Sequence, residues 1–326
     1  MSASQTAAEI VFDRATKRYP GRTQPAVSEL SLTIPAGEIC VLVGPSGGGK
    51  TTAMKMVNRL ISITEGDITI DGTSVRSLDL AELRRGIGYV IQQVGLFPHL
   101  SVGDNVGTVP KLLRWPKKRI RARVEELLEL VGLEAADAER FPSELSGGQR
   151  QRVGLARALA ANPPLMLMDE PFGAIDPIRR AALQDEFLRL HNELRKTVIF
   201  VTHDIDEAIK MGDRIAILQE GGVLAQYDTP DEILANPAND FVERFVGADR
   251  GLKRLSLRRV GDVELEPAPD DFDGPRCSPA TSLRDALSLM LTEGARTVIV
   301  VDDDGSSIGV LSVQRVSDLL HEEVTA

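Results

Sequence analysis

A glycine-rich stretch, Gly44–Thr52 with the sequence GPSGGGKTT, constrains the fold of this chain more than any other feature. It follows the apolar run Ile39–Val43 and precedes a helix-like segment, Thr51–Leu60. Because glycines lack a Cβ atom, such a loop can turn successive backbone N–H groups toward a phosphate, and the helix N-terminus completes an anion site. The sequence therefore predicts a phosphate-binding loop between a buried parallel strand and a helix, in an α/β fold.

The side chains of this loop suit a nucleoside triphosphate with Mg²⁺. Lys50 supplies a compact positive charge for the β- and γ-phosphates, and Thr51 offers its hydroxyl to the metal ion. A flexible glycine turn with a surface lysine is the alternative, which the flanking strand and helix disfavour. The loop residues expected to bind the nucleotide are Gly44, Ser46, Gly47, Gly49, Lys50, Thr51 and Thr52.

Length and charge narrow the class of protein. A chain of 326 residues is about the length of two domains. Lys and Arg number 38 against 48 Asp and Glu, so the net charge of −10 argues against a nucleic-acid binder. The sequence has no apolar run of about 20 residues and no secretory signal at its start, which favours a soluble, cytoplasmic protein. The two cysteines, Cys40 and Cys277, are far apart in sequence and are expected to be reduced, without a metal role.

Polar residues follow three further apolar strands, at the edge of a parallel sheet where ligands bind. Gln92 follows one strand and can reach a metal ion or a water molecule, although a solvated loop amide is the alternative. Asp169 and Glu170 follow the second strand, which suits Mg²⁺ coordination through water by Asp169 and polarisation of the attacking water by Glu170. His203 follows the third and can bond a γ-phosphate or orient the water. Asp176 lies in a nearby turn, close enough in sequence to share the site.

Two other segments are candidates for nucleotide contact. Tyr19, in an opening β region, can supply a stacking face for adenine, and a plain surface tyrosine is the alternative. The turn formed by Ser146, Gly147, Gly148 and Gln149 leads into a long helix, whose N-terminus can hold phosphate oxygens. This turn ends a mostly helical stretch, about 94–161, which we interpret as a helical subdomain inserted into the α/β core.

With these motifs in this order, the chain resembles the ATP-binding subunit of ABC transporters from about Ile10 to Gly247. The resemblance implies a P-loop NTPase with a RecA-like core, an antiparallel β region and the inserted helical subdomain. It also implies a head-to-tail homodimer that holds two ATP molecules, each between Lys50 of one protomer and residues 146–149 of the other. In that family a residue like Tyr19 stacks on adenine, one like Gln92 senses Mg²⁺ and the membrane subunit, and Glu170 is the catalytic base. Asp176 communicates across the dimer and His203 contacts the γ-phosphate.

A closer likeness is to the importers of quaternary amines such as glycine betaine, carnitine and choline. It is carried by the stretches Val57–Leu60, Ile87–His99, Val109–Trp115 and Phe200–Lys210. The implied partners are transmembrane permease subunits at the cytoplasmic face of the membrane and, indirectly, an extracytoplasmic solute-binding protein. Two departures, Gly48 in place of serine or cysteine and Ile175 in place of leucine, remove no charged or ligating atom, so we expect an active ATPase.

The end of the chain resembles a single CBS motif. We expect an ATPase domain over 1–247, a linker rich in Pro and Asp over 248–279, and the CBS motif over 280–326, a small α/β unit. Its predicted order is helix, strand, strand and helix. Such a motif buries its sheet by pairing, which suggests a dimerising or regulatory tail. Arg315 stands where nucleotide-binding CBS motifs usually have aspartate after Ser312, which argues against adenosine binding.

Three alternatives remain at this point. The cargo could be an amino acid, a metal or an oligosaccharide. A soluble ABC ATPase of DNA repair or translation would usually show tandem cassettes, coiled-coil arms or basic surfaces, none of which this acidic chain displays. A regulatory module that binds nucleotide without hydrolysis is disfavoured by Glu170.

Overall fold

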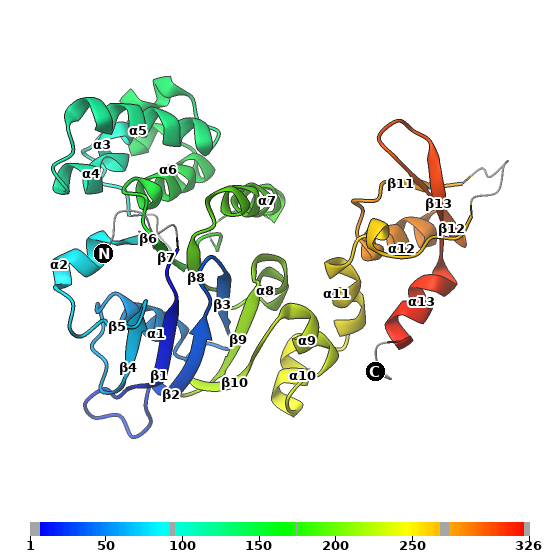
Figure 1. Ribbon diagram of the computed structural model, residues 1–326, viewed down its shortest axis with the longest axis horizontal. Helices are drawn as coiled ribbons and strands as arrows, with labels where there is room; N and C mark the ends of the chain where they lie inside the picture. The colour runs from blue at the N-terminus through cyan, green and yellow to red at the C-terminus, as the bar shows by residue number, and fades with distance from the viewer. Residues whose placement is uncertain (1–6, 92–94, 174, 176, 268–273, 323–326) are drawn as a thin grey trace. The chain divides into compact units, whose positions relative to one another are not determined.

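The computed structural model divides into two compact units, Met1–Tyr227 and Asp228–Ala326 (Figure 1). The structure describes residues 7–91, 95–173, 175, 177–267 and 274–322. Each unit has an apolar core of its own, so we describe each one separately.

The first unit is built on a six-stranded sheet in the order β10-β9-β3-β8-β7-β6. Strand β3 pairs in parallel with β8 and β9, and β7 pairs in parallel with β6 and β8. Every residue of β3, β7 and β8 is buried, which is why these strands are continuous apolar runs in the sequence. The strands are β3 (Ile39–Val43), β6 (Ile87–Val90), β7 (Leu165–Asp169), β8 (Thr197–Val201), β9 (Arg214–Gln219) and β10 (Val223–Asp228).

A second sheet of the same unit is antiparallel, in the order β2-β1-β4-β5. Its strands are β1 (Ile10–Lys17), β2 (Val27–Ile34), β4 (Glu65–Ile70) and β5 (Thr73–Ser74). One core joins Phe12 and Leu30 of this sheet, Leu42 of β3 and Met54 of helix α1 (Lys50–Val57). The helix that follows the glycine-rich loop is thus fixed by apolar packing against both sheets.

The elements from 102 to 159 are all helical, as the sequence predicted, and they lie together beyond one edge of the large sheet in Figure 1. The helices of the first unit are α1, α2 (Leu80–Arg85), α3 (Val102–Val106), α4 (Thr108–Leu112), α5 (Lys117–Leu130), α6 (Gly147–Leu159), α7 (Pro177–Leu194) and α8 (Ile205–Met211), with 3₁₀ turns η1 (Ala135–Glu139) and η2 (Pro142–Glu144). None of the helices in the described parts of the chain combines the length and apolar character needed to cross a membrane.

The second unit holds a three-stranded sheet in the order β11-β12-β13, covered by helices. The predicted strand Thr297–Val301 is β12, and the predicted order of helix, strand, strand and helix is present. The elements are α9 (Pro230–Ala235), α10 (Asp240–Val246), α11 (Arg250–Leu257), η3 (Val260–Asp262), β11 (Arg276–Cys277), α12 (Leu283–Thr292), β12 (Thr297–Val301), β13 (Ser307–Ser312) and α13 (Val313–Glu322).

The segment expected as an irregular linker begins with a helix, α11. Its Leu255 is buried in the core of the second unit, and Arg254 forms an ion pair with Asp231 of α9, with Nε and Oδ1 3.0 Å apart. These contacts draw residues 228–247 into the second unit, whereas the sequence suggested a boundary after Gly247. The functional boundary after Gly247 stays a prediction.

Candidate functional site

The glycine-rich loop lies at the carboxyl end of β3, and its path depends on two close backbone approaches. A Cβ atom on Gly44 would lie 2.1 Å from the carbonyl oxygen of Leu218, and one on Gly49 would lie 2.2 Å from that of Ala26. Gly49 also has φ of 75°, a conformation that other residues rarely adopt. The loop is therefore pressed against the end of β9 and the start of β2, and glycine is required at both positions.

Gly44→Ala is expected to lower both stability and ATP affinity, because the added methyl overlaps a backbone atom that has no room to move. An extra methyl forced into a packed site costs about 1–3 kcal/mol, which lowers the Tm of a domain of this size by several degrees. Gly251→Ala is the matched control, since a Cβ atom there comes no closer than 4.0 Å to Leu320 Cδ2 and the position lies outside the pocket. Thermal unfolding and nucleotide titration check both variants. Equal losses would contradict the steric argument.

Lys50 is held inside the loop as the sequence required. Its side chain is 7% exposed, and its Nζ donates hydrogen bonds to the carbonyl oxygens of Gly44 and Pro45 at 2.7 and 2.8 Å. Burial lowers the pKa of Lys50, while the nearby Glu170 and Asp169 carboxylates counter that shift. The ammonium group is thus a preorganised cation in a largely desolvated place, where it interacts with a phosphate more strongly than in water.

The hydroxyl of Thr51 and the carboxylate of Asp169 lie side by side, as expected of two oxygen ligands. Thr51 Oγ1 donates to Asp169 Oδ1 at 2.8 Å. Lys55, one helical turn after Thr51, has its Nζ 3.6 Å from Asp169 Oδ2. Lys55 belongs to no sequence motif, although its i+4 spacing from Thr51 places both residues on one face of α1.

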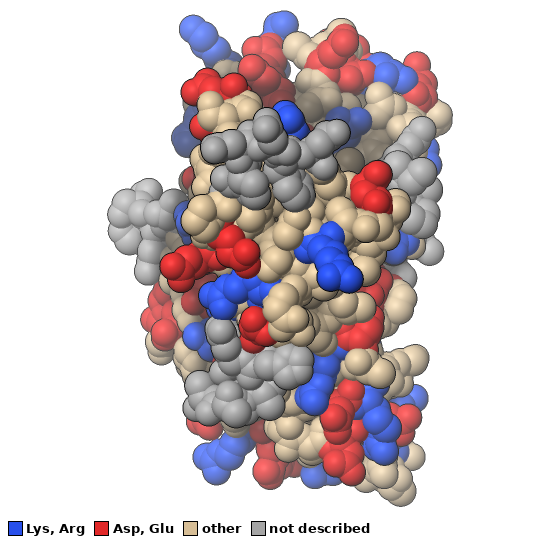
Figure 2. Space-filling view, turned by 90° about the vertical axis from the view of Figure 1, so that its right-hand side faces the viewer, with Lys and Arg blue, Asp and Glu red and all other residues tan. Residues whose placement is uncertain are grey.

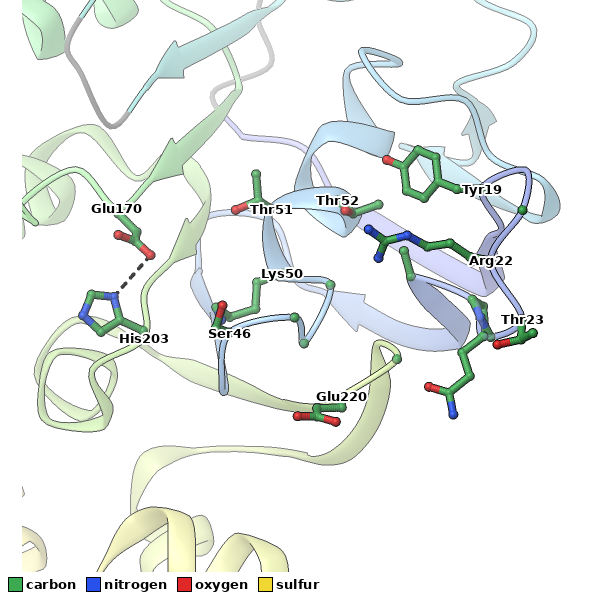
Figure 3. Close-up of a pocket in the computed structure, with 18 residues that line it drawn as sticks. Tyr19, Arg22, Thr23, Ser46, Lys50, Thr51, Thr52, Glu170, His203 and Glu220 are labelled. Atoms are coloured by element: carbon green, nitrogen blue, oxygen red, sulfur yellow. Dashed lines mark hydrogen bonds and ion pairs between the residues drawn. The ribbon is translucent and has the colours of Figure 1, made fainter.

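Glu170 and His203 form the polar pair at the edge of the sheet (Figure 3). Glu170 Oε1 and His203 Nδ1 are 3.2 Å apart. Glu170 has φ of 45°, rare for a residue other than glycine, and its backbone N–H donates to the carbonyl of Val201 at 2.9 Å. Backbone strain of this kind costs about 1–3 kcal/mol and occurs where the surroundings fix a functional side chain.

An open pocket of about 1210 Å³ connects these groups with the opening β region. It is lined by Tyr19, by residues 46–52 of the loop, and by Glu170 and His203. Figure 3 shows Tyr19 on one side of Lys50 and the Glu170–His203 pair on the other. Tyr19 and the phosphate-loop residues thus line the same pocket, and the stacking role of Tyr19 stays a prediction.

Several residues that line the pocket were not predicted from the sequence, because they belong to no motif. Arg22, Thr23, Gln24 and Glu220 come from the β1–β2 loop and the β9–β10 hairpin. Only the close approach of these loops to the phosphate loop, made possible by Gly49 and Gly222, brings them to the pocket.

Ser146 begins α6 with a capping box. Its Oγ accepts from the backbone N–H of Gln149 at 3.2 Å, and its own N–H donates to Gln149 Oε1 at 2.9 Å. Ser146 and Gly147 are exposed, so this helix N-terminus is open to a ligand. Residues 146–149 are described, yet none of them lines the pocket that contains Lys50.

Two predicted site residues, Gln92 and Asp176, lie outside the described residues. The two cysteines, Cys40 and Cys277, are both free and buried. Burial raises the pKa of the Cys40 thiol to about 12, so this group is an uncharged part of the core.

Comparison with known proteins places this site in a family. The ABC transporter family model matches residues 27–173, and the CBS domain model matches 272–322. The osmoprotectant import ATP-binding protein OsmV of Salmonella typhimurium is 48% identical over 304 residues, which are 92% of this chain and 78% of that protein. The chain belongs to the ABC transporter ATP-binding subunits.

Two further comparisons support the assignment. The glycine betaine/carnitine/choline transport ATP-binding protein OpuCA of Bacillus subtilis is 48% identical over 94% of this chain and 78% of that protein. The ATP-binding cassette MJ0796, solved as a dimer in a post-hydrolysis state with ADP and Pi, is 35% identical with a TM-score of 0.60. That match covers 68% of this chain and 98% of the cassette. The predicted fold, the ATPase activity and the resemblance to this branch of importers are confirmed.

Proposed function

We propose that this ABC ATPase drives the import of quaternary amine solutes such as glycine betaine, carnitine or choline. The observation that carries the hydrolytic role is the pocket that gathers Lys50, Thr51, Glu170 and His203 at one edge of the sheet. The solute class rests on the relatives, whose names specify osmoprotectants or these amines.

Mg²⁺ fits the oxygen atoms at this edge. Thr51 Oγ1 and Asp169 Oδ1 are adjacent, and Mg²⁺ is usually held by one or two protein oxygens together with nucleotide phosphates and water. No group of three or more His, Cys, Asp or Glu side chains in the described residues forms a separate metal site. When bound with ATP, the ion would neutralise charge on the β- and γ-phosphates. Gln92 is the third proposed contact of the ion.

Residues of the chain itself would bind the nucleotide and activate the attacking water. Tyr19 stacks on adenine, and the loop N–H groups with Lys50 hold the phosphates. Glu170 accepts a proton from the attacking water. His203 is hydrogen-bonded to the Glu170 carboxylate and faces the γ-phosphate. Asp176 acts across the dimer.

The active form is proposed to be a head-to-tail homodimer. Residues 146–149 offer an exposed helix N-terminus that the Lys50 pocket of the same chain does not include, so the second half of each site comes from a partner copy. The dimeric solved cassette supports this arrangement.

The helical subdomain offers a surface for the transmembrane permease. Phe97, Leu112 and Leu113 are 43%, 59% and 37% exposed, although large apolar side chains are usually covered. The loop that carries Phe97 is fixed by Asn105, which is fully buried and bonds both the N–H and the carbonyl of Phe97. These side chains suit contact with another protein, and we place the subunit peripherally at the cytoplasmic face of the membrane.

Nucleic acid is not among the proposed partners. The net charge of −10 opposes it, and Lys and Arg are interspersed with Asp and Glu over the described part of the face in Figure 2. In the second unit, the Ser312 hydroxyl donates to the Glu266 carboxylate at 2.9 Å, which adds to the Arg315 argument against adenosine phosphates there. A role of this tail in pairing or regulation stays a proposal.

Uptake of labelled glycine betaine, choline and carnitine after osmotic upshift tests the proposal, in a strain that lacks other uptake systems for these solutes. Wild type is expected to restore uptake of at least one solute, and Glu170→Gln to abolish it, because import requires repeated hydrolysis. Hydrolysis of ATP by the wild type without uptake of any of the three would refute the solute class and leave the ATPase assignment standing.

A further inference from the structure

Arg180, Gln184 and Glu207 form a partly buried polar link between the segment that carries Glu170 and the segment that carries His203. Arg180 and Gln184 are one turn apart on α7, and Glu207 lies on α8. None of the three lines the nucleotide pocket. Their contacts lead instead to the backbone on either side of the catalytic pair.

The first end of the link reaches the turn that follows Glu170. Arg180 donates through an Nη atom to the carbonyl of Ile175 at 3.0 Å. The same turn is closed by hydrogen bonds from the N–H of Ile175 to the carbonyl of Phe172 and from the N–H of Gly173 to the carbonyl of Glu170. The guanidinium group of Arg180 therefore anchors the chain that leads directly to the Glu170 side chain.

The second end of the link holds the backbone around His203. The hydroxyl of Thr202 accepts from the N–H of Asp204 at 3.1 Å, and the same side chain lowers the pKa of the Glu207 carboxyl. Asp204 in turn accepts from the N–H groups of residues 206 and 207 at the start of α8. Asp204 is thus fixed by the first turn of α8, which also carries Glu207, while the imidazole of His203 contacts Glu170.

The two ends meet between α7 and α8. Gln184, 6% exposed, donates to Glu207 Oε1 at 3.0 Å. Burial raises the pKa of Glu207, and the Thr202 and Gln184 hydrogen bonds and the nearby Arg180 charge oppose that rise. The Nε atom of Arg180 is buried and has no hydrogen-bond partner among the described residues.

We propose that Arg180 and Glu207 are positioning residues for hydrolysis, which hold Glu170 and His203 in their mutual geometry through α7 and α8. The inference rests on the catalytic roles proposed above for Glu170 and His203. A shift of the pair by about 1 Å costs up to about 10²-fold in rate, because the attacking water is then misaligned. Nucleotide affinity depends on the phosphate loop and is expected to be independent of this link.

The test compares ATP turnover and nucleotide affinity for Arg180→Ala, Glu207→Ala and the double variant. We expect each single variant to lose about tenfold or more in kcat, with the Kd for ATP changed less than about twofold. The double variant should be no slower than the slower single one, because both changes break the same link. Arg180→Lys, which keeps a donor for the Ile175 carbonyl, should recover part of the rate.

The matched control is Lys210→Ala. Lys210 of α8 pairs with Asp185 of α7, with Nζ and Oδ1 2.7 Å apart, so it joins the same two helices without contact with either catalytic segment. If the link were only a clamp between helices, Lys210→Ala would slow turnover as much as Arg180→Ala, and the proposal would be overturned. Wild-type turnover in Glu207→Ala, which removes the acceptor of the Gln184 hydrogen bond, would overturn it even if Arg180→Ala failed to fold.

Glu170→Gln and His203→Ala separate this inference from the roles on which it depends. If both lose turnover while Arg180→Ala and Glu207→Ala keep it, the link is not required and only the inference fails. If Glu170→Gln and His203→Ala hydrolyse ATP normally, the proposed catalytic pair fails and the inference fails with it.

Discussion

Glu170→Gln is expected to bind ATP as wild type does and to hydrolyse it about 10²- to 10⁴-fold more slowly, the usual contribution of a general base. The amide keeps the size of the side chain and can still bond His203, so the pocket should be unchanged. It cannot accept the proton of the attacking water. Because dimer opening would then wait for hydrolysis, ATP should hold the variant as a dimer that size-exclusion chromatography separates from the monomer.

Glu193→Gln is a suitable control for this experiment. Glu193 lies on α7 and pairs with Arg189 at 2.6 Å on the exposed side of the helix, away from the pocket. The Glu193→Gln variant should hydrolyse ATP at the wild-type rate. Turnover of Glu170→Gln within about twofold of that control would mean that another group is the base, and the strained backbone of Glu170 would then lack a catalytic explanation.

Much of this site was predictable because two local signals coincide. Asp169, Glu170 and His203 each follow a continuous apolar run, and such runs become the buried parallel strands β7 and β8. Parallel strands bring their carboxyl ends to one edge, so position along the chain was enough to predict proximity. The glycine loop was predictable for a similar reason, since its spacing is dictated by the backbone that must pass Leu218 and Ala26.

Contacts between helices and the sheet were not predictable in this way. The approach of Lys55 to Asp169, and the link from Arg180 to Glu207, join residues that are far apart in sequence and carry no motif. Their proximity depends on how α1, α7 and α8 lie on the sheet. The periodicity of apolar residues predicts only which face of each helix is buried, so it could not predict these contacts.

The prediction was wrong at helix α11 for a different reason. An irregular linker was predicted over 248–279 because of the prolines and aspartates near 266–275. The first residues of that segment nevertheless have helical spacing, with Leu252 and Leu255 three positions apart. Short helices of this kind are stabilised by tertiary contacts more than by propensity. Here the burial of Leu255 and the ion pair of Arg254 supply them.

A mixture of two inactive variants, Lys50→Ala and Ser146→Arg, is expected to recover ATP hydrolysis that neither shows alone. Lys50→Ala removes the buried cation of the phosphate loop, and loss of a charge-assisted hydrogen bond costs about 1.5–3 kcal/mol in ATP affinity. Ser146→Arg places a bulky side chain at the exposed start of α6 and removes the hydroxyl that caps it. In a head-to-tail dimer of one copy of each, one site combines an intact Lys50 with an intact Ser146.

The recovery distinguishes the two possible sources of Ser146, because a site built within one chain would stay broken in every molecule of the mixture. Random pairing makes about half of the dimers mixed, each with one intact site, so a clear fraction of wild-type turnover should return on mixing and rise with protein concentration. Two Lys50→Ala preparations mixed in the same way provide the matched control and should remain inactive. Persistent inactivity of the mixed pair, with ATP-dependent dimers of wild type still present, would place both halves of the site in one protomer and refute the composite site.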